Sequence, residues 1–165
     1  MNNKKIVYVG REDILDIKYR NFSGRPDDYN KNGAMPNATL VITPAKASEL
    51  SEKGFNIREY INNDGDPEYR LKVFARFDKF PPKIVKICGK KRIPLDEETI
   101  GSLDNDEIEG IDLSINPYYY SISSDREGIK AYITAGLFYI VQDEIDLILE
   151  RLEEDDEKYD MPFGE

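Results

Sequence analysis

The residue types that most often perform catalysis are scarce in this chain. It contains no histidine and one cysteine, Cys88, among 165 residues. Histidine is the side chain most used for proton transfer near neutral pH and the commonest metal ligand. Ser–His and Cys–His nucleophile pairs are therefore impossible, and a structural zinc site would depend on carboxylates, which zinc seldom accepts alone. The sequence predicts no catalytic residue, no metal site and no cofactor.

Three segments contain residue types found in catalytic or ion-binding motifs, but their spacing argues against each. Asp16-Ile17-Lys18 and Pro26-Asp27 offer the carboxylates of a metal-dependent nuclease. In the restriction-nuclease pattern, however, the Pro-Asp pair comes first, and here it comes second. Residues 104–112 have the acid density of a calcium loop, with Ile108 at a ligand position. Residues 89–91 lack both the preceding glycine and the Ser or Thr of a phosphate-binding loop. A solvated surface is the simpler interpretation of all three.

Charge is strongly segregated along the chain. The formal net charge is −10 at pH 7, yet residues 1–94 carry +7, residues 95–142 carry −8 and residues 143–165 carry −9. A basic half followed by an acidic belt and an acidic end is an asymmetry that suggests a polyanionic partner.

A candidate binding face lies on a strand predicted at residues 69–77. Strict alternation places these side chains on the core face: Tyr69, Leu71, Val73, Ala75 and Phe77. It places these on the exposed face: Arg70, Lys72, Phe74 and Arg76. An aromatic ring among cations can stack a base while the cations contact phosphates, as sequence-independent binding of a single strand requires. A solvated strand with one exposed phenylalanine is the alternative.

Further cations follow this strand. Residues 70–92 hold nine Lys and Arg but one acid, Asp78. Exposed ion pairs contribute about 0–1 kcal/mol each, and the neighbouring acids that would form them are missing, so we assign the run to phosphate contacts. The additional candidates are Lys83, Lys86, Lys90, Lys91 and Arg92. A solvated hairpin tip at residues 89–92 is the alternative.

A second candidate face combines aromatic residues of two predicted strands. Residues 118–120 are consecutive tyrosines, and a later strand presents a mixed set: Lys130, Tyr132, Thr134 and Phe138. These alternate with a predicted buried set: Ile129, Ala131, Ile133, Ala135 and Leu137. We favour Tyr119 and Tyr132 as stacking platforms and Lys130 as a further phosphate contact. Core packing is the alternative for each tyrosine.

The elements that would position these side chains are short strands separated by turn residues. Strands are predicted at residues 6–9, 14–22, 38–43, 55–61, 69–77, 83–87, 111–115, 118–122 and 129–141. Thr43 caps a helix with Pro44 at its first position, and Asp96 starts a second, small helix. A last helix is predicted to dock on the barrel through Ile145, Ile148, Leu149 and Leu152.

Many short strands with brief helices predict an all-β dominated fold, a closed or nearly closed barrel of five or more strands. Residues 1–142 form the predicted barrel, residues 143–152 the C-terminal helix and residues 153–165 an acidic flexible tail, since self-repulsion and low hydrophobicity disfavour packing. Neither a signal peptide nor a membrane span is predicted, so we expect a cytoplasmic protein.

Several motifs, taken in order, resemble the bacteriophage single-stranded-DNA-binding protein family. The segments are Arg20-Asn21-Phe22-Ser23-Gly24, Tyr29-Asn30, residues 47–55, Phe80-Pro81-Pro82-Lys83-Ile84, Leu103-Asp104, Asn116-Pro117-Tyr118-Tyr119 and Gly128-Ile129-Lys130-Ala131-Tyr132. The resemblance spans residues 19–142. It implies an OB-like barrel that coats single-stranded DNA during phage replication or recombination, with no cofactor. Residues 33–37 depart from the family pattern, so no DNA-gripping role is carried over to that loop.

The C-terminal residues also resemble the acidic Pro-Phe tip of bacterial single-strand-binding proteins. The residues that carry this resemblance are Asp155, Asp156, Asp160, Met161, Pro162 and Phe163. Gly164 and Glu165 follow Phe163, where that tip ends in phenylalanine. Residues 153–165 hold seven acids and one base, so we expect this tethered segment to compete with DNA for the basic face. Its displacement by DNA would free the tip to recruit replication or recombination proteins.

Two questions stay open from the sequence. The oligomeric state is either a monomer or a homodimer. The alternative function is an acidic DNA mimic that inhibits a host DNA-binding enzyme through the two acidic segments.

Overall fold

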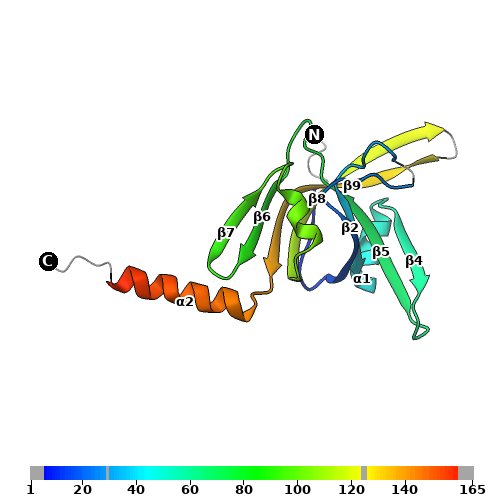
Figure 1. Ribbon diagram of the computed structural model, residues 1–165. Helices are drawn as coiled ribbons and strands as arrows, with labels where there is room; N and C mark the ends of the chain where they lie inside the picture. Colours follow the sequence, from blue (N-terminus) through cyan, green and yellow to red (C-terminus); the bar gives the residue numbers. More distant parts are fainter. Residues whose placement is uncertain (1–5, 29, 124–125, 160–165) are drawn as a thin grey trace.

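A nine-stranded sheet curls around one hydrophobic core in the computed structural model, which describes residues 6–28, 30–123 and 126–159 (Figure 1). The strands are β1 (Val7–Val9), β2 (Ile14–Asn21), β3 (Asn37–Ile42), β4 (Ile57–Ile61), β5 (Pro67–Phe74), β6 (Lys83–Cys88), β7 (Lys91–Leu95), β8 (Ile108–Ser123) and β9 (Arg126–Ile140). The helices are α1 (Pro44–Glu52), the 3-10 helix η2 (Ile100–Asp104) and α2 (Glu144–Tyr159). The all-β dominated prediction is confirmed.

Strand β9 connects the parts of the sheet. The main path runs β1-β8-β9-β5-β3-β2, with β4 paired to β5 and the β6–β7 hairpin paired to β9. The first part of β9 pairs in parallel with β5, and its last part pairs in parallel with β6. Antiparallel pairing with β8 runs along almost its whole length. The first half of β9 therefore joins the part of the sheet that contains β5, and its second half joins the β6–β7 hairpin.

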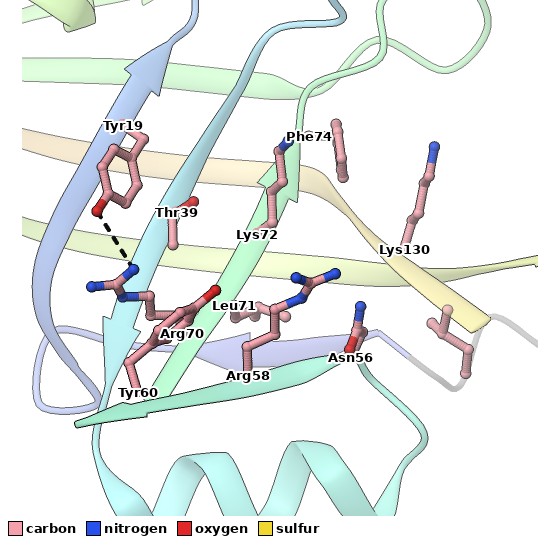
Figure 2. A pocket seen from close by; sticks show the side chains of 11 residues that line it. Tyr19, Thr39, Asn56, Arg58, Tyr60, Arg70, Leu71, Lys72, Phe74 and Lys130 are labelled. Atoms are coloured by element: carbon pink, nitrogen blue, oxygen red, sulfur yellow. Dashed lines mark hydrogen bonds between the residues drawn. The ribbon is translucent and has the colours of Figure 1, made fainter. Parts of the chain in front are cut away.

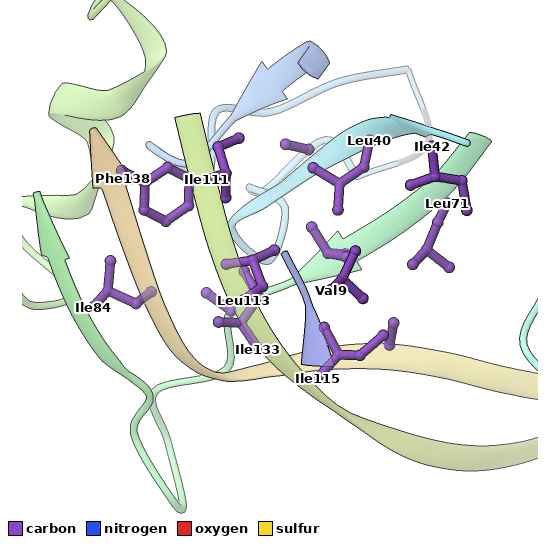
Figure 3. Packing of buried hydrophobic residues seen from close by; sticks show 14 of the residues in the cluster. Val9, Leu40, Ile42, Leu71, Ile84, Ile111, Leu113, Ile115, Ile133 and Phe138 are labelled. Atoms are coloured by element: carbon purple, nitrogen blue, oxygen red, sulfur yellow. The ribbon is translucent and has the colours of Figure 1, made fainter. Parts of the chain in front are cut away.

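The core fills the inside of the curled sheet. Figure 3 shows side chains of β1, β3, β5, β6, β8 and β9 meeting there, with Leu40, Leu71 and Ile115 among those that are fully buried. On β5, Leu71 and Val73 are buried while Lys72 is exposed, which confirms the alternation predicted for this strand. Helix α1 is capped as predicted, because the Thr43 hydroxyl accepts a hydrogen bond from the Lys46 amide at 3.2 Å.

The two-residue alternation of β9 reverses at Thr134. Ser114 and Ile115 are neighbours on β8, but they pair with Ala135 and Ile133, so Thr134 is a one-residue bulge. Its hydroxyl donates a hydrogen bond to the Ser114 carbonyl at 3.0 Å. Because side chains alternate with a period of two, one extra residue moves all later side chains to the opposite face.

Phe138 shows the consequence of this bulge. The unbroken alternation predicted it on the exposed face, but it is 1% exposed and its ring meets Phe22 edge-on, with the centroids 5.8 Å apart. Ala135 and Leu137, predicted to be buried, are partly exposed. The prediction for this half of the strand was wrong because sequence alternation does not reveal where a bulge inserts.

Other boundaries also differ from the predictions. The two strands predicted at residues 111–115 and 118–122 form one continuous strand, β8. Strand β7 was not predicted, since it contains Pro94; it pairs only with β6, and an edge strand tolerates proline. The chain makes a turn after Asp96, and the 3-10 helix begins only at Ile100.

Helix α2 does not dock on the barrel through its apolar face, so this prediction was wrong. Figure 1 shows the helix extending away from the sheet, past the tip of the β6–β7 hairpin. The predicted docking residues are 53–67% exposed: Ile145, Ile148, Leu149 and Leu152. Its acidic face contacts the hairpin instead, through ion pairs of Glu154 with Lys90 and of Glu153 with Lys91 at 3.6 Å. The helix therefore meets the hairpin through charged side chains while its apolar stripe stays exposed.

The helix is also longer than predicted. It continues through residues 153–159, which the sequence prediction assigned to the flexible tail and which include Asp155 and Asp156. No glycine or proline occurs between residues 144 and 161, and Glu and Lys are good helix formers. The tail residues Asp160, Met161, Pro162 and Phe163 lie outside the described residues.

Across the residues described, none of the helices has the length and apolar character needed to cross a membrane.

The buried position of Phe138 yields a test of the bulge. Phe138→Ala should lower the free energy of unfolding by about 3–5 kcal/mol, because a buried aromatic leaves a cavity when truncated. Urea denaturation measures this change. Lys130→Ala, before the bulge on the outer face, is the control and should stay within about 0.5 kcal/mol of the wild type. A similarly small effect of Phe138→Ala would contradict the reversal at Thr134.

Candidate nucleic-acid interface

A hollow of about 460 Å³ opens over the outer face of β5 (Figure 2). Its lining consists of Tyr19, Thr39, Asn56, Arg58, Tyr60, Arg70, Leu71, Lys72, Phe74, Ile129 and Lys130. Three of these residues are aromatic and four are cationic, and the lining contains no carboxylate. Within the described ranges, no three His, Cys, Asp or Glu side chains are grouped to hold a metal ion.

Strand β5 forms the floor of the hollow because it lies between other strands on both sides. β3 pairs along one edge, while β4 and then β9 pair along the other. The pairing places Thr39 beside Lys72, Arg58 beside Arg70, and Tyr132 beside Phe74. Alternation turns these outer side chains toward the same surface. The hollow is thus built mainly on paired strands, with Asn56 added from the segment before β4.

Phe74 lies at the centre of an aromatic and cationic cluster. Its ring meets Tyr132 edge-on at 6.2 Å between centroids. The ammonium groups of Lys72 and Lys130 lie 5.4 and 5.2 Å from the centroid of the Phe74 ring. Tyr118 extends the cluster, with its ring centroid 5.1 Å from that of Tyr132. The group combines π-faces with positive charge, the two features that a nucleic-acid strand needs.

Arg76 closes one side of this cluster. Its guanidinium lies 6.0 Å from the ring centroids of both Tyr118 and Tyr132, and Asp78 accepts a hydrogen bond from its Nε at 2.6 Å. That hydrogen bond lowers the pKa of Asp78, whereas burial raises the pKa of Tyr132. The hydrogen bond to Asp78 thus holds the guanidinium beside the two tyrosine rings.

The other end of the hollow is organised by Arg70. Its Nε donates a hydrogen bond to Glu68 at 2.7 Å, and Lys18 Nζ lies 3.3 Å from the same carboxylate. The guanidinium lies 4.1 Å from the centroid of Tyr60 and 5.5 Å from that of Tyr19. The hydrogen bond from Arg70, aided by that from Lys18, holds the pKa of Glu68 below its usual range. Arg70 is therefore fixed in direction.

Six of the predicted site residues share this face. They are Arg70, Lys72, Phe74, Arg76, Lys130 and Tyr132. Within the tyrosine run, it is Tyr118 whose ring contacts Tyr132, while Tyr119 follows it on β8 and is exposed. The sequence predicted the β5 face and the residues of β9 as two separate candidate faces, and the structure brings them together on one surface.

The other five predicted cations lie on the β6–β7 hairpin, which Figure 1 shows on the opposite side of the molecule from β4 and β5. They are Lys83, Lys86, Lys90, Lys91 and Arg92. Lys86 donates hydrogen bonds to Asp106 at 2.8 Å and to Ser102 at 3.1 Å, and α2 supplies acids to Lys90 and Lys91. The sequence run looked deficient in acids because its partners come from residues much later in the chain.

Three residues of this face were missed by the sequence analysis: Tyr19, Arg58 and Tyr60. Tyr118 was among the candidate tyrosines, but Tyr119 was favoured as the stacking platform. Arg58 and Tyr60 alternate on β4, which pairs with β5, so their positions follow once that hairpin is recognised. Tyr19 carried no such signal. Alternation would place Tyr19 on the core side of β2 together with Ile17, which packs against the core. A positive φ of 52° at Tyr19 instead accompanies a ring that lines the hollow.

Comparison with known proteins places the chain among phage proteins. The model of the family described as "Putative phage ssDNA-binding domain" matches residues 4–161. No curated protein matches the chain.

Solved structures similar to the chain include the single-stranded DNA-binding protein from bacteriophage Enc34. It is 9% identical, with 86% of this chain and 84% of that chain covered and a TM-score of 0.52. The same protein in complex with ssDNA is 10% identical, with 86% and 89% covered and a TM-score of 0.53. The gp2.5 protein, a single-stranded DNA binding protein encoded by bacteriophage T7, is 12% identical, with 85% and 94% covered and a TM-score of 0.40. The likeness to the Enc34 protein confirms the predicted OB-like barrel.

The ion pairs of Glu68 give a pH-dependent prediction. Because the folded-state pKa is held below the ordinary value of about 4.3, the carboxylate stabilises the fold above that pH and loses its contribution as pH falls through the folded-state pKa. Glu68→Gln cannot titrate, so its free energy of unfolding should decline less steeply with acid than that of the wild type. Urea denaturation over a pH series measures the slope. The exposed Glu59→Gln should retain the wild-type slope, and an unchanged slope in Glu68→Gln would contradict its pairing with Arg70.

Proposed function

The chain belongs to the phage ssDNA-binding domain family, and from this premise we propose that it binds single-stranded DNA, without sequence preference, across the outer face of β5. The observation that carries the proposal is the hollow with three aromatic rings, four cations and no carboxylate in its lining. Stacking accepts every base because each base has a π-face, and the cations neutralise the phosphates. We infer a binding role and no catalysis.

The Phe74 cluster serves as the base-stacking platform. Phe74 is partly exposed, and its edge-on contact with Tyr132 holds its ring on paired strands that need little reordering on binding. Lys72 and Lys130 lie over the ring in the free protein, and their long side chains can swing aside to contact the phosphates that flank a stacked base. Arg76 adds a fixed charge at the edge of the platform.

The hairpin cations form a second contact region. Lys83 and Arg92 are exposed, so we propose that they meet a strand that leaves the hollow along β9. Lys86 is held by Asp106 and mainly joins the hairpin to η2 and its following turn. Lys90 and Lys91 contact acids of α2, so DNA reaches them only by displacing those acids.

We propose that the acidic C-terminal segment competes with DNA. Glu153 and Glu154 already contact hairpin cations, and five further acids follow before the chain ends. A tethered competitor acts at an effective concentration in the millimolar range. Displacement by DNA would free Asp155, Asp156, Asp160, Met161, Pro162 and Phe163 to recruit a replication or recombination protein in the host cytoplasm.

An acidic DNA mimic is the competing function. It would use the negative segments and would have no role for a hollow lined by cations and rings. Binding of oligo(dT) separates the two, because a mimic would not bind it.

Salt dependence tests the proposed function. Four cations are placed for phosphate contact, Arg58, Lys72, Arg76 and Lys130. With a slope of about −0.7 per contact, affinity for oligo(dT) should fall roughly 50-fold between about 50 and 200 mM salt. Fluorescence anisotropy of a labelled oligonucleotide measures it. No binding, or an affinity that does not respond to salt, would overturn the proposal.

Phe74→Ala tests the stacking platform. We expect binding of oligo(dT) to weaken by about 1–3 kcal/mol, because one base loses its stacking partner, with a nearly unchanged melting temperature. Ile61→Ala, which removes an exposed apolar side chain on β4, should alter neither quantity. A large drop in melting temperature for Phe74→Ala would show that the ring belongs to the core.

Truncation after Leu152 tests the competition. The shortened chain lacks Glu153 and Glu154, so Lys90 and Lys91 become available and oligo(dT) should bind several-fold more tightly at low salt. The gain should shrink as salt screens the charges. Phe163→Ala, as a control, should leave DNA affinity unchanged while abolishing capture of a partner protein. Weaker DNA binding by the truncated chain would contradict the competition.

A further inference from the structure

Tyr19 has an unusual backbone conformation. Its φ of 52° is the only positive value of a non-glycine residue among those described. This region is disfavoured for a residue with a Cβ atom, and such residues cluster at ligand-binding and catalytic sites. The β2–β3 register shifts between Lys18 and Asn21, so the conformation belongs to a bulge.

The bulge moves an aromatic ring out of the core and onto the outer face. Ile17 packs against the core, and ordinary alternation would direct Tyr19 to the same side. Tyr19 is instead 67% exposed and lines the hollow (Figure 2). A strained backbone and an exposed ring both disfavour the folded state, which indicates that the arrangement serves binding.

Arg70 holds this ring together with that of Tyr60. Its guanidinium lies between the two side chains, 4.1 Å from the Tyr60 centroid and 5.5 Å from the Tyr19 centroid, and its Nη1 is 3.5 Å from the Tyr19 hydroxyl (Figure 2). Glu68, whose side chain is 14% exposed, fixes the guanidinium through an ion pair of 2.7 Å with its Nε. Because these contacts restrain Arg70, it acts as a positioning residue for the two rings more than as a phosphate contact.

We propose that Tyr19 and Tyr60 form a second base-stacking station, distinct from the Phe74 cluster. Arg70 and Phe74 are four residues apart on β5, a separation of roughly 13 Å along a strand. The two stations therefore hold different bases of one DNA strand. Arg58 and Lys72 line the hollow between them and receive the intervening phosphates. This inference rests on the proposed function and assigns a nucleobase to a part of the face that sequence patterns did not reveal.

A tryptophan reporter tests the station directly, because the chain contains no tryptophan. The indole of Tyr19→Trp should be quenched by about half on adding unlabelled oligo(dT), as stacking on a base requires. Ile61→Trp is the matched control. Ile61 is 66% exposed and follows Tyr60 on β4, where alternation turns it to the opposite face, so its emission should stay unchanged.

Anisotropy of labelled oligo(dT) is recorded on the same samples. Intact binding without quenching in Tyr19→Trp would overturn the second station and leave the proposed function standing. Absence of binding by the wild-type chain would instead overturn the proposed function.

Tyr19→Gly separates binding from folding. Glycine accepts a positive φ, so the melting temperature should stay the same or rise, while affinity for oligo(dT) should fall about 10-fold through loss of stacking. Tyr19→Phe retains the ring and should bind within about 2-fold of the wild type. Unchanged DNA affinity in Tyr19→Gly, whatever its melting temperature, would overturn the station.

Discussion

One extra residue in β9, Thr134, makes the two halves of this strand turn opposite sets of side chains toward the core. Before it, Ala131 and Ile133 point inward, so Lys130 and Tyr132 point outward beside Phe74. After it, Phe138 enters the core, and β9 pairs with β6. Without the bulge one of these halves would expose its apolar residues, because a sheet has a period of two. The core and the proposed binding face depend on the same local irregularity.

The proposed binding face stays basic in a chain of net charge −10, because acidic side chains pair with cations elsewhere or lie outside the lining of the hollow. Glu153 and Glu154 contact the hairpin, and Asp106 holds Lys86. Glu68 forms an ion pair with Arg70 and orients it, but does not belong to the lining of the hollow. At physiological ionic strength the Debye length is about 8 Å, so a DNA strand responds to the charges of the surface it touches and far less to the total. The positive charge of the hollow, and not the negative net charge of the chain, is therefore what a DNA strand would meet on this face.

Two features lower the stability of the folded chain, and a role in DNA binding would account for both. Tyr19 keeps a disfavoured backbone conformation and an exposed ring. Helix α2 contacts the barrel through charged residues, which contribute little when they are exposed, and leaves apolar side chains in solvent. A helix held this weakly is easily displaced, which suits the competition with DNA that we propose for this segment.

Much of the fold could be predicted from short-range patterns. Alternation along β5 separated Leu71 and Val73 from Lys72 and Phe74, and the cap at Thr43 located α1, because both patterns arise from neighbouring residues on one element. The barrel class followed from the number of short strands, and the family from the order of its motifs.

Other features depend on partners that are distant in sequence. The acids that hold Lys86 and Lys90 lie 20 and 64 residues away, and the bulge at Thr134 is defined only by pairing with β8. Tyr19 reaches Arg70, 51 residues later, through a backbone conformation that no residue pattern signals. Local alternation determines which side chains share a face of one strand, but only the pairing of remote strands determines which faces meet to form the binding surface.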